Sequence, residues 1–580
     1  MMEISPLTPV SPEPGTPATA ETHRMRIGII GTGPTALYTL KALLESDRPY
    51  DIHLYEAGET LGPGIPFSAE TTPLSMLANI AGVELPPVCE TLNAWAGRQN
   101  PVQLAGWGIA ASARDERAFF PRVVLGAYFA DQFDLLLAQH GTPHQVNVHR
   151  CHRVTDVVTF PDHVRIDWQT RSGPGTDRVD RLVIATGYRP HGPARAVSLP
   201  DPASHIGILG SSLSAIDAVV NLALQHGAFI ETAEGLAYQG DTAWQATMLS
   251  RNGLLPEADF WFPFPLEPLN LFTDAALAGL VTGRDGDLDR VFALFARQLR
   301  KLDPAYARSI DLDSANADSF VERYFARRLA SDPFTHARDN LAEARASHDR
   351  RQTQPWRYAI LRMHEGFGGI VPHLSPRDLQ RFERGLKRCF ADNYAAVPHL
   401  SIQRLLALHH AGVLRVERLG QTYSLQDLGK DGWLIRLGER QLHVGALVDA
   451  RGQQPLGLDL FPFPTLRLQL CAHADARGQD WSDGLTAGED LALVPDDPAL
   501  GRVHCLALPF LLKRRPFIQG LCESAALGKA TAHALGRGAS AAEDTRGQIN
   551  RYLATLETTT PVYCGDAASI RTINLPRKSF

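Results

Sequence analysis

Apolar and polar positions near the start of the chain follow the order strand, helix, strand. The apolar run Met25–Ile30 is typical of a strand buried in a parallel sheet, and Thr35–Glu45 has helical spacing. The alternating run Asp51–Glu56 then predicts a second strand. The same order returns later in three segments: a strand beginning at Ile206, a helix at Ser214–His226 and a strand at Gln245–Ser250. The chain therefore contains two βαβ units.

Further segments fill the space between and after these units. The pattern predicts a helix at Val123–Leu137 and strands at Val154–Phe160, Val164–Trp168 and Arg181–Ile184. From about Pro256 to Val397, helical spacing dominates, as in Leu288–Leu302, Phe320–Leu329 and Pro376–Tyr394. Strands return at Leu414–Arg418, Trp433–Leu437 and Ala446–Asp449. We interpret the middle stretch as a helical insertion or cap.

Composition narrows the class of protein. The chain has 580 residues, enough for two or three domains, and its net charge of −6 argues against nucleic-acid binding. No apolar run reaches the roughly 18 residues that indicate a membrane span. The seven cysteines are scattered, which favours reduced thiols in a cytoplasmic protein. The group His140, His144, His149, Cys151 and His152 matches no metal-ligand spacing, so we expect no metal site.

The first βαβ unit carries the turn Gly31-Thr-Gly-Pro-Thr-Ala36. Gly31 permits the tight turn, Gly33 lets backbone amides approach a pyrophosphate, and Ala36 allows close helix–strand packing. Glu56 ends the next strand, where its carboxylate accepts hydrogen bonds from ribose hydroxyls and repels a 2′-phosphate. The unit therefore predicts an FAD or NAD site with contacts at Gly31, Gly33, Pro34, Thr35, Ala36 and Glu56. The alternative is a glycine turn in an unrelated α/β fold.

The second unit departs from this pattern at its turn, Gly210-Ser-Ser-Leu-Ser-Ala215. Ser212 occupies the place of the middle glycine, which leaves either a more distant pyrophosphate or a vestigial site. Arg251 follows the next strand, where a guanidinium binds a 2′-phosphate, so NADPH is favoured over a merely exposed arginine. The long spacing from Gly210 to Arg251 predicts an inserted excursion around Glu231–Trp244.

Two further segments carry candidate chemistry. Gly187, after the strand Arg181–Ile184, belongs to a small-residue exit that suits a crossing between nucleotide domains. Gly520 precedes a helix start whose dipole would stabilise a reduced flavin. The neighbouring run Lys513–Arg515 would attract an anionic substrate, although solvated surface charge is the alternative.

These motifs resemble two-dinucleotide flavoproteins related to flavin-dependent N-monooxygenases, in particular the family that includes the nitrosuccinate-forming aspartate N-monooxygenases. The similar stretches are Ile27–Ala36, Gly62–Phe67 with Leu77–Asn79, Phe120–Gly126 with Tyr128, Gly210–Asp217, Ser250–Pro256 and Gly520–Ala525. The resemblance implies FAD at the first turn, with Gly64, Asn79 and Arg122 at the outer parts of the cofactor. It also implies NADPH at Gly210, Ser212, Ser214 and Arg251.

The expected fold is α/β, with two Rossmann-like dinucleotide-binding domains and a largely helical insertion. The expected boundaries are 1–24 for a disordered tail, 25–200 for the first segment of the FAD-binding domain, 201–255 for the first part of the NADPH-binding domain, 256–400 for the insertion, 401–455 for the return of the NADPH-binding domain, and 456–580 for the second FAD-domain segment with a C-terminal tail.

The resemblance implies an NADPH-dependent FAD monooxygenase. NADPH would reduce FAD, the flavin would capture dioxygen as a C4a-hydroperoxide, and oxygen would pass to the amine of a small, aspartate-like amino acid. Two alternatives stay open: an NAD(P)H-dependent flavin reductase or dehydrogenase without oxygen insertion, and a non-catalytic FAD-stabilised interaction protein. The expected partners are a small-molecule substrate and dioxygen, and the question of a homo-oligomer stays open.

Overall fold

The computed structural model describes residues 24–109, 115–139, 141, 143–187, 205–482 and 484–537. The predicted disordered tail lies outside these residues apart from Arg24, and so do His140 and the tail after residue 537. Within the described part of the chain, every helix is too short or too polar to cross a lipid bilayer.

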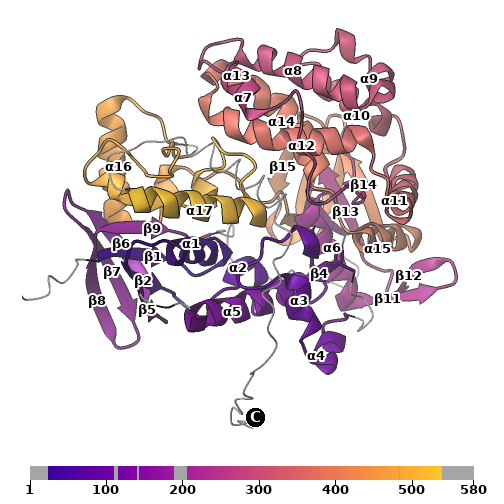
Figure 1. Ribbon diagram of the computed structural model, residues 1–580. Coiled ribbons are helices and arrows are strands. Elements are labelled where there is room, and N and C mark those ends of the chain that lie inside the picture. The colour runs from indigo at the N-terminus through magenta and orange to yellow at the C-terminus, as the bar shows by residue number, and fades with distance from the viewer. Residues whose placement is uncertain are drawn as a thin grey trace, which may run out of the picture.

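The first parallel sheet combines strands from both ends of the chain (Figure 1). In spatial order its strands are β19 (Val503–Cys505), β9 (Arg181–Ile184), β1 (Met25–Ile30), β2 (Tyr50–Tyr55) and β5 (Gln145–His149). The predicted strand Met25–Ile30 is confirmed, and its apolar side chains are buried because helices and a second sheet cover both faces. The second sheet is antiparallel and consists of β6 (Arg153–Thr159), β7 (Val164–Thr170) and β8 (Gly173–Val179).

Two helices in the half of the fold that contains the first parallel sheet pack unusually closely. They are α1 (Pro34–Leu44), the helix after the first glycine turn, and α17 (Leu521–Arg537), the last described helix. A Cβ atom on Gly528 of α17 would lie 2.7 Å from the backbone nitrogen of Thr39, so only glycine allows this approach. The Thr35 hydroxyl donates a hydrogen bond of 3.1 Å to Ser524 Oγ, which brings the first turns of both helices together.

The remaining elements of this half cover the sheet or border its edge. They are α2 (Gly64–Phe67), β3 (Leu77–Ala81), α3 (Leu92–Gly97), α4 (Pro101–Gly106), β4 (Phe119–Pro121), α5 (Arg122–Gln139) and α16 (Pro464–Arg477). The predicted helix Val123–Leu137 is confirmed within α5.

The second parallel sheet repeats the arrangement of the first. Its strands are β14 (Leu414–Arg418), β13 (Gln245–Ser250), β10 (His205–Leu209) and β18 (Ala446–Asp449), covered by α6 (Leu213–His226) and α15 (His399–His410). The predicted excursion is confirmed as the hairpin of β11 (Gly227–Thr232) and β12 (Gly235–Gly240). A three-stranded antiparallel sheet contains β15 (Ser424–Asp427), β16 (Trp433–Leu437) and β17 (Arg440–Val444).

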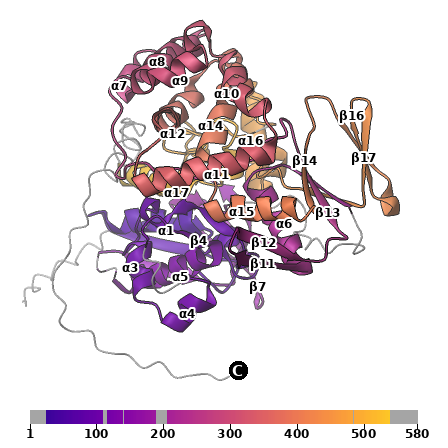
Figure 2. The same cartoon turned by 90° about the vertical axis from the view of Figure 1, so that its right-hand side faces the viewer.

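The helical part of the chain lies together on one side of the two parallel sheets (Figure 2). Its helices are α7 (Asp274–Ala278), α8 (Asp287–Leu302), α9 (Pro304–Ser309), α10 (Phe320–Leu329), α11 (Pro333–Arg350), α12 (Pro355–Ile370), α13 (Pro376–Arg384) and α14 (Leu386–Tyr394). The expected helical stretch Pro376–Tyr394 is divided in two at Gly385. A Cβ atom there would lie 3.0 Å from the carbonyl oxygen of Ala317, so the glycine permits a sharp break against a neighbouring loop.

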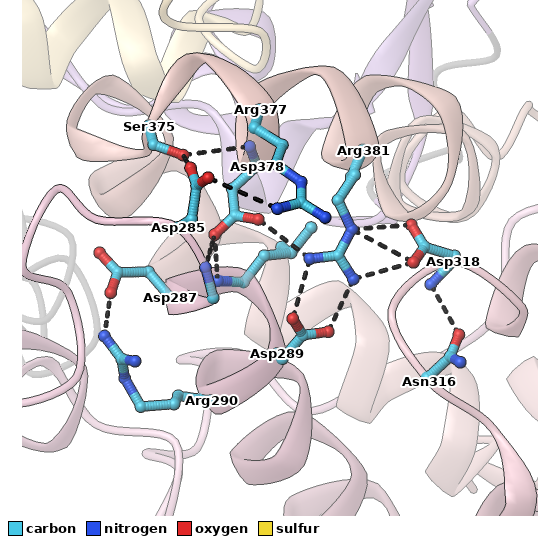
Figure 3. Close-up of polar contacts among 12 residues, drawn as sticks. Asp285, Asp287, Asp289, Arg290, Asn316, Asp318, Ser375, Arg377, Asp378 and Arg381 are labelled. Atoms are coloured by element: carbon cyan, nitrogen blue, oxygen red, sulfur yellow. Dashed lines mark hydrogen bonds and ion pairs between the residues drawn. The ribbon is translucent and has the colours of Figure 1, made fainter.

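An arginine-centred network joins α8 to α13 (Figure 3). Arg381 forms ion pairs with Asp289, Asp318 and Asp378 at 2.7 Å, 2.8 Å and 2.9 Å. The second oxygen of Asp378 accepts hydrogen bonds from the backbone nitrogens of Gly286 and Leu288 at the start of α8. Since cationic and amide partners occupy these carboxylates, we assign the cluster a structural role.

A buried ionic group joins the helices to the segment that leaves β13. Glu257 is 6% exposed and faces Arg357, which is 1% exposed, with 3.3 Å between Glu257 Oε2 and Arg357 Nε. Arg328 Nε and His336 Nε2 lie 3.9 Å and 3.4 Å from Glu257 Oε1. Burial opposes ionisation of Glu257, but the Arg357 charge and the other cations hold its pKa below the usual value.

Candidate active site

A cleft of about 2950 Å³ lies where the carboxyl ends of the two parallel sheets meet. The glycine turn after β1 and the start of α6 after β10 both line it, as do residues that follow β2, β9 and β18. Ligands of open α/β sheets bind at such carboxyl ends. Pockets for a single drug-sized ligand have volumes of roughly 300–1000 Å³. The cleft therefore has room for more than one ligand.

The first glycine turn has the shape of a phosphate cradle. Gly31 has φ +90°, and a Cβ atom there would lie 2.5 Å from the carbonyl oxygen of Ala185. Gly33 is the N-cap of α1, with no side-chain cap and no acidic residue in the first turn. A Cβ atom on Gly33 would lie 3.4 Å from the Cα of Gly64, across the gap between the two turns. The amides of α1 are therefore open to a phosphate.

The Glu56 carboxylate is held in place at the end of β2, where it lines the cleft. Its Oε2 accepts a hydrogen bond of 2.6 Å from the Thr32 hydroxyl, and its Oε1 accepts one of 2.9 Å from the Gly58 backbone. These bonds orient a carboxylate beside the first turn, in the position that suits a ribose.

The second turn repeats this geometry. Gly210 has φ +116°, and a Cβ atom there would lie 2.7 Å from the carbonyl oxygen of Ala450. Gly31 has the same relation to the carbonyl oxygen of Ala185 in the first turn. Ser212 is the N-cap of α6 and has extended backbone angles (φ −102°, ψ −158°), which any residue adopts. Its side chain does not cap the helix, and the first turn contains no acidic residue. The backbone therefore tolerates serine where Gly33 stands in the first turn.

The remaining sequence-predicted residues lie at different depths. Seven of them line the cleft: Pro34, Thr35, Gly64, Asn79, Gly187, Ser214 and Gly520. Three others, Ala36, Gly210 and Arg251, do not line it. Ala36 is 1% exposed and packs inside the core of the first half. Gly210 lies beneath the second turn, against the backbone after β18.

Arg122 lines the cleft and joins the part of the fold that contains the first parallel sheet to α6, which covers the second. Its Nη2 lies 2.6 Å from Asp217 Oδ2 on α6, and its Nε donates to the carbonyl oxygen of Leu77. Burial raises the pKa of Asp217, and the charge of Arg122 opposes this rise. Because Asp217 neutralises it, Arg122 is a link between the halves as well as a candidate cofactor contact.

Arg251 is exposed at the carboxyl end of β13, beside a second arginine that sequence reasoning missed. This residue, Arg388 on α14, donates to Asn252 Oδ1 at 3.2 Å. Burial lowers the pKa of Arg388, and the nearby charge of Arg251 lowers it further. Two guanidinium groups of like charge therefore lie close together in this region. The sequence around Arg388 does not indicate that this residue lies near Arg251, because 137 positions separate the two arginines.

Acidic side chains gather at the end of the cleft beside α17. Glu84, Glu365 and Glu523 all line it, and sequence reasoning missed all three. Glu523 lies in the first turn of α17, so the N-terminus of this helix already carries a carboxyl group. The predicted Lys513–Arg515 anion site has three cations, and two of them have separate partners. Lys513 Nζ pairs with Glu383 at 3.3 Å, whereas Arg515 donates a hydrogen bond to the Gly488 carbonyl oxygen and lines a smaller pocket.

The histidine side chains near the first sheet pack against other aromatic rings. His149 stacks on His53 and Tyr55, and His152 packs on Trp168. In the described parts of the chain, no three histidine, cysteine or acidic side chains gather in a way that could hold a metal ion.

Two family models match parts of the chain, and several solved structures are similar to it. Residues 28–189 match the family described as "FAD-NAD(P)-binding", and residues 273–394 match the "YdhS-like middle domain". Among solved structures, the ornithine N-hydroxylase of Kutzneria sp. 744 is 14% identical with a TM-score of 0.46, over 89% of this chain and 99% of that one. The L-lysine 6-monooxygenase of Pseudomonas syringae is 15% identical with a TM-score of 0.44, over 90% of this chain and 100% of that one.

A full-length relative gives a much stronger match. The Escherichia coli (strain K12) protein titled "Uncharacterized protein YdhS" is 39% identical over 535 residues, which cover 89% of this chain and 98% of the relative. The FAD-NAD(P)-binding match contains the first glycine turn and Glu56, and the middle-domain match contains the helices from α7 to α14. The chain belongs to the YdhS family and carries an FAD-NAD(P)-binding domain.

Proposed function

We propose that this protein is an NADPH-dependent FAD monooxygenase that oxidises the amine nitrogen of a small molecule with dioxygen. One observation carries the proposal: two glycine turns of equivalent geometry, each before an uncapped helix, serve a single cleft of about 2950 Å³. Two dinucleotides bound there would lie close enough for hydride transfer. The solved structures with similar folds include enzymes titled as N-hydroxylases and monooxygenases.

The residues divide between the two cofactors as the turns suggest. The amides at the start of α1 would hold the FAD pyrophosphate, and Glu56 would accept hydrogen bonds from its ribose. The rest of this cofactor would contact four further residues that line the same cleft: Gly64, Asn79, Gly187 and Gly520. When bound, FAD supplies electron transfer and oxygen activation, so the protein needs no catalytic triad.

The second turn would hold NADPH. Amides at the start of α6, with Ser212 and Ser214, would bind its pyrophosphate. Arg251 and Arg388 would hold the 2′-phosphate, because two nearby guanidinium groups suit a dianion better than one. Glu56 makes the first turn unsuitable for the same phosphate, so the two coenzymes are sorted by charge.

The choice of substrate follows from the acidic end of the cleft. The expectation of an aspartate-like substrate depends on the family resemblance and on the cations of Lys513–Arg515. In the structure Lys513 is paired with Glu383, and Arg515 lines the smaller pocket. Three carboxyl groups lie on the side of the cleft beside α17. We therefore propose a small amine and place an acidic amino acid second.

Spectroscopy and product analysis test this function. We expect the purified protein to be yellow, NADPH to bleach it, and an amine to increase NADPH consumption and yield a product with added oxygen by mass spectrometry. Bleaching without an oxygenated product from any amine or amino acid would favour a flavin reductase. A colourless protein that takes up no FAD would contradict the proposal.

Arg251→Ala is expected to raise the KM for NADPH by about tenfold or more, the loss typical of one charged hydrogen bond. The KM for NADH should change little, because NADH lacks the 2′-phosphate. Arg388→Ala should behave in the same way, and Arg297→Ala, an exposed residue on α8, is the matched control. Steady-state kinetics with both coenzymes measures the effect, and equal changes for NADPH and NADH would remove the 2′-phosphate assignment.

A further inference from the structure

A second, smaller pocket lies between α12 of the middle domain and the start of α17. Its volume is about 90 Å³, too small for a dinucleotide and suited to a small molecule. His364, Glu365, Phe517 and Glu523 line both this pocket and the main cleft. These four residues therefore form the boundary where a small ligand would meet a cofactor bound in the cleft.

The polar groups at this boundary are hydrogen-bond acceptors. Glu365 Oε2 accepts a bond of 2.7 Å from Arg362, which leaves its other oxygen available. Glu523 comes from the first turn of α17, and Glu84 lines the cleft nearby, where its carbonyl oxygen accepts a hydrogen bond from Cys522 Sγ. These carboxyl groups come from three separate elements of the fold, so no local sequence pattern connects them.

His364 is a second, independent indication of a ligand. It is 9% exposed, and its Nδ1 bonds to the carbonyl oxygen of Leu361 in the preceding turn of α12. That bond makes Nδ1 the protonated nitrogen, so Nε2 carries a lone pair. Nε2 has no hydrogen-bond partner among the described residues, and the ring lines both cavities. An unpaired acceptor on a ring that is only 9% exposed suits a hydrogen-bond donor supplied by a ligand.

Burial and mutual repulsion make these carboxyl groups suitable for a cationic ligand. Burial raises the pKa of Glu523 to about 7, with the Glu365 charge as a smaller cause. Burial also raises the pKa of Glu84 to about 8, assisted by Asp259. Burial lowers the pKa of His364, which keeps its ring neutral. A bound cation would relieve the cost of ionising both glutamates.

We propose that the pocket between α12 and α17 is the substrate site, and that it binds a small organic ammonium ion through Glu365, Glu523 and His364 Nε2. An ammonium group has three N–H donors, which match three acceptors at the boundary. Phe517, Ile518 and Leu527 supply apolar walls for a short alkyl chain, and Arg515 lies on the same pocket. This inference rests on the proposed amine-oxidising function and assigns its substrate site.

Binding of the ammonium ion is expected to strengthen as pH rises from about 6 to 8. Glu523 has its pKa near 7, so its carboxylate forms over this interval and attracts the cation. The titratable groups that line the same two cavities are His364 and Glu365 of α12, His373, Glu489, Arg515, Glu84, Cys522 and Tyr394 of α14. Calorimetric titration at several pH values measures the trend, and Glu523→Gln should flatten it. An unchanged pH dependence in this variant would contradict the role of Glu523.

The decisive test compares three probes of similar size on the full-length protein: n-propylammonium, n-propanol and propionate. Isothermal titration at millimolar probe measures binding without turnover, and flavin content is recorded separately. We expect n-propylammonium alone to bind, with affinity reduced roughly tenfold or more in Glu365→Gln and in Glu523→Gln. Glu322→Gln, on the exposed face of α10, is the matched control and should bind normally. Circular dichroism and the melting temperature establish that each variant is folded.

Each outcome separates this inference from the proposed function. Binding of propionate in preference to n-propylammonium would overturn the ammonium assignment and point to Arg515 instead. No binding of n-propylammonium, or equal affinity in wild type and both glutamine variants, would also overturn it, even if the protein is yellow and oxidises an amine elsewhere in the cleft. If the protein lacks FAD but binds n-propylammonium as expected, the proposed function fails and the site stands.

Discussion

Gly31→Ala is expected to yield a protein that is purified colourless and binds added FAD about a hundredfold more weakly or worse. A Cβ atom at this position would lie 2.5 Å from the Ala185 carbonyl oxygen, and φ +90° strains any residue with a side chain. The strain alone costs roughly 1–2 kcal/mol, and relief of the clash would move the turn that cradles the pyrophosphate. Absorbance near the flavin bands and titration with FAD measure the loss.

Gly438→Ala is the matched control for this prediction. Gly438 also has positive φ, +63°, but an added Cβ atom there would meet nothing within 4 Å. This variant should keep its FAD, because it introduces backbone strain in the turn between β16 and β17 without a clash or a nearby cofactor. Normal FAD content in Gly31→Ala would show that the first turn does not hold the pyrophosphate.

Glu257→Gln is expected to lower the melting temperature by roughly 3–4 °C. The substitution keeps the size of the side chain but leaves Arg357, 1% exposed, without its anion, whereas Arg328 keeps its ion pair with Asp392. Breaking a buried ion pair on one side costs about 3–5 kcal/mol, because a buried charge stays uncompensated. Differential scanning calorimetry measures the shift.

Two variants distinguish this mechanism from a general intolerance at the position. Glu322→Gln, exposed on α10, should change the melting temperature by less than about 1 °C. Glu257→Leu combined with Arg357→Met removes both charges of the closest pair and should recover part of the stability. If Glu257→Gln melts at the wild-type temperature, the buried network does not hold the helices to the second sheet.

Much of the local structure follows from spacing alone. The strand Met25–Ile30, the strand Arg181–Ile184 and the excursion after α6 are confirmed, because apolar periodicity and turn residues act over short stretches. The division of Pro376–Tyr394 was missed. Gly385 breaks that stretch because a distant loop at Ala317 packs against it, and periodicity carries no record of such a neighbour.

The candidate site shows the same limit. Residues of the two turns were predictable, since each motif is continuous in sequence. Arg388, Glu365 and Glu523 were not, because they come from helices whose own patterns indicate only burial and solvent exposure. The anion site expected at Lys513–Arg515 was also separated by the fold, which pairs Lys513 with Glu383 of α13.

The amino-acid order by itself determined two βαβ units, their glycine turns and the opposite charges of Glu56 and Arg251 that follow them, because these features depend on neighbours within about 40 positions. Only the tertiary structure decided that both turns open on one cleft, that Arg388 stands beside Arg251, and that carboxyl groups from α12 and α17 meet at its end. The reason is physical: burial and charge at these points depend on helices packed from remote parts of the chain, which a linear pattern does not encode.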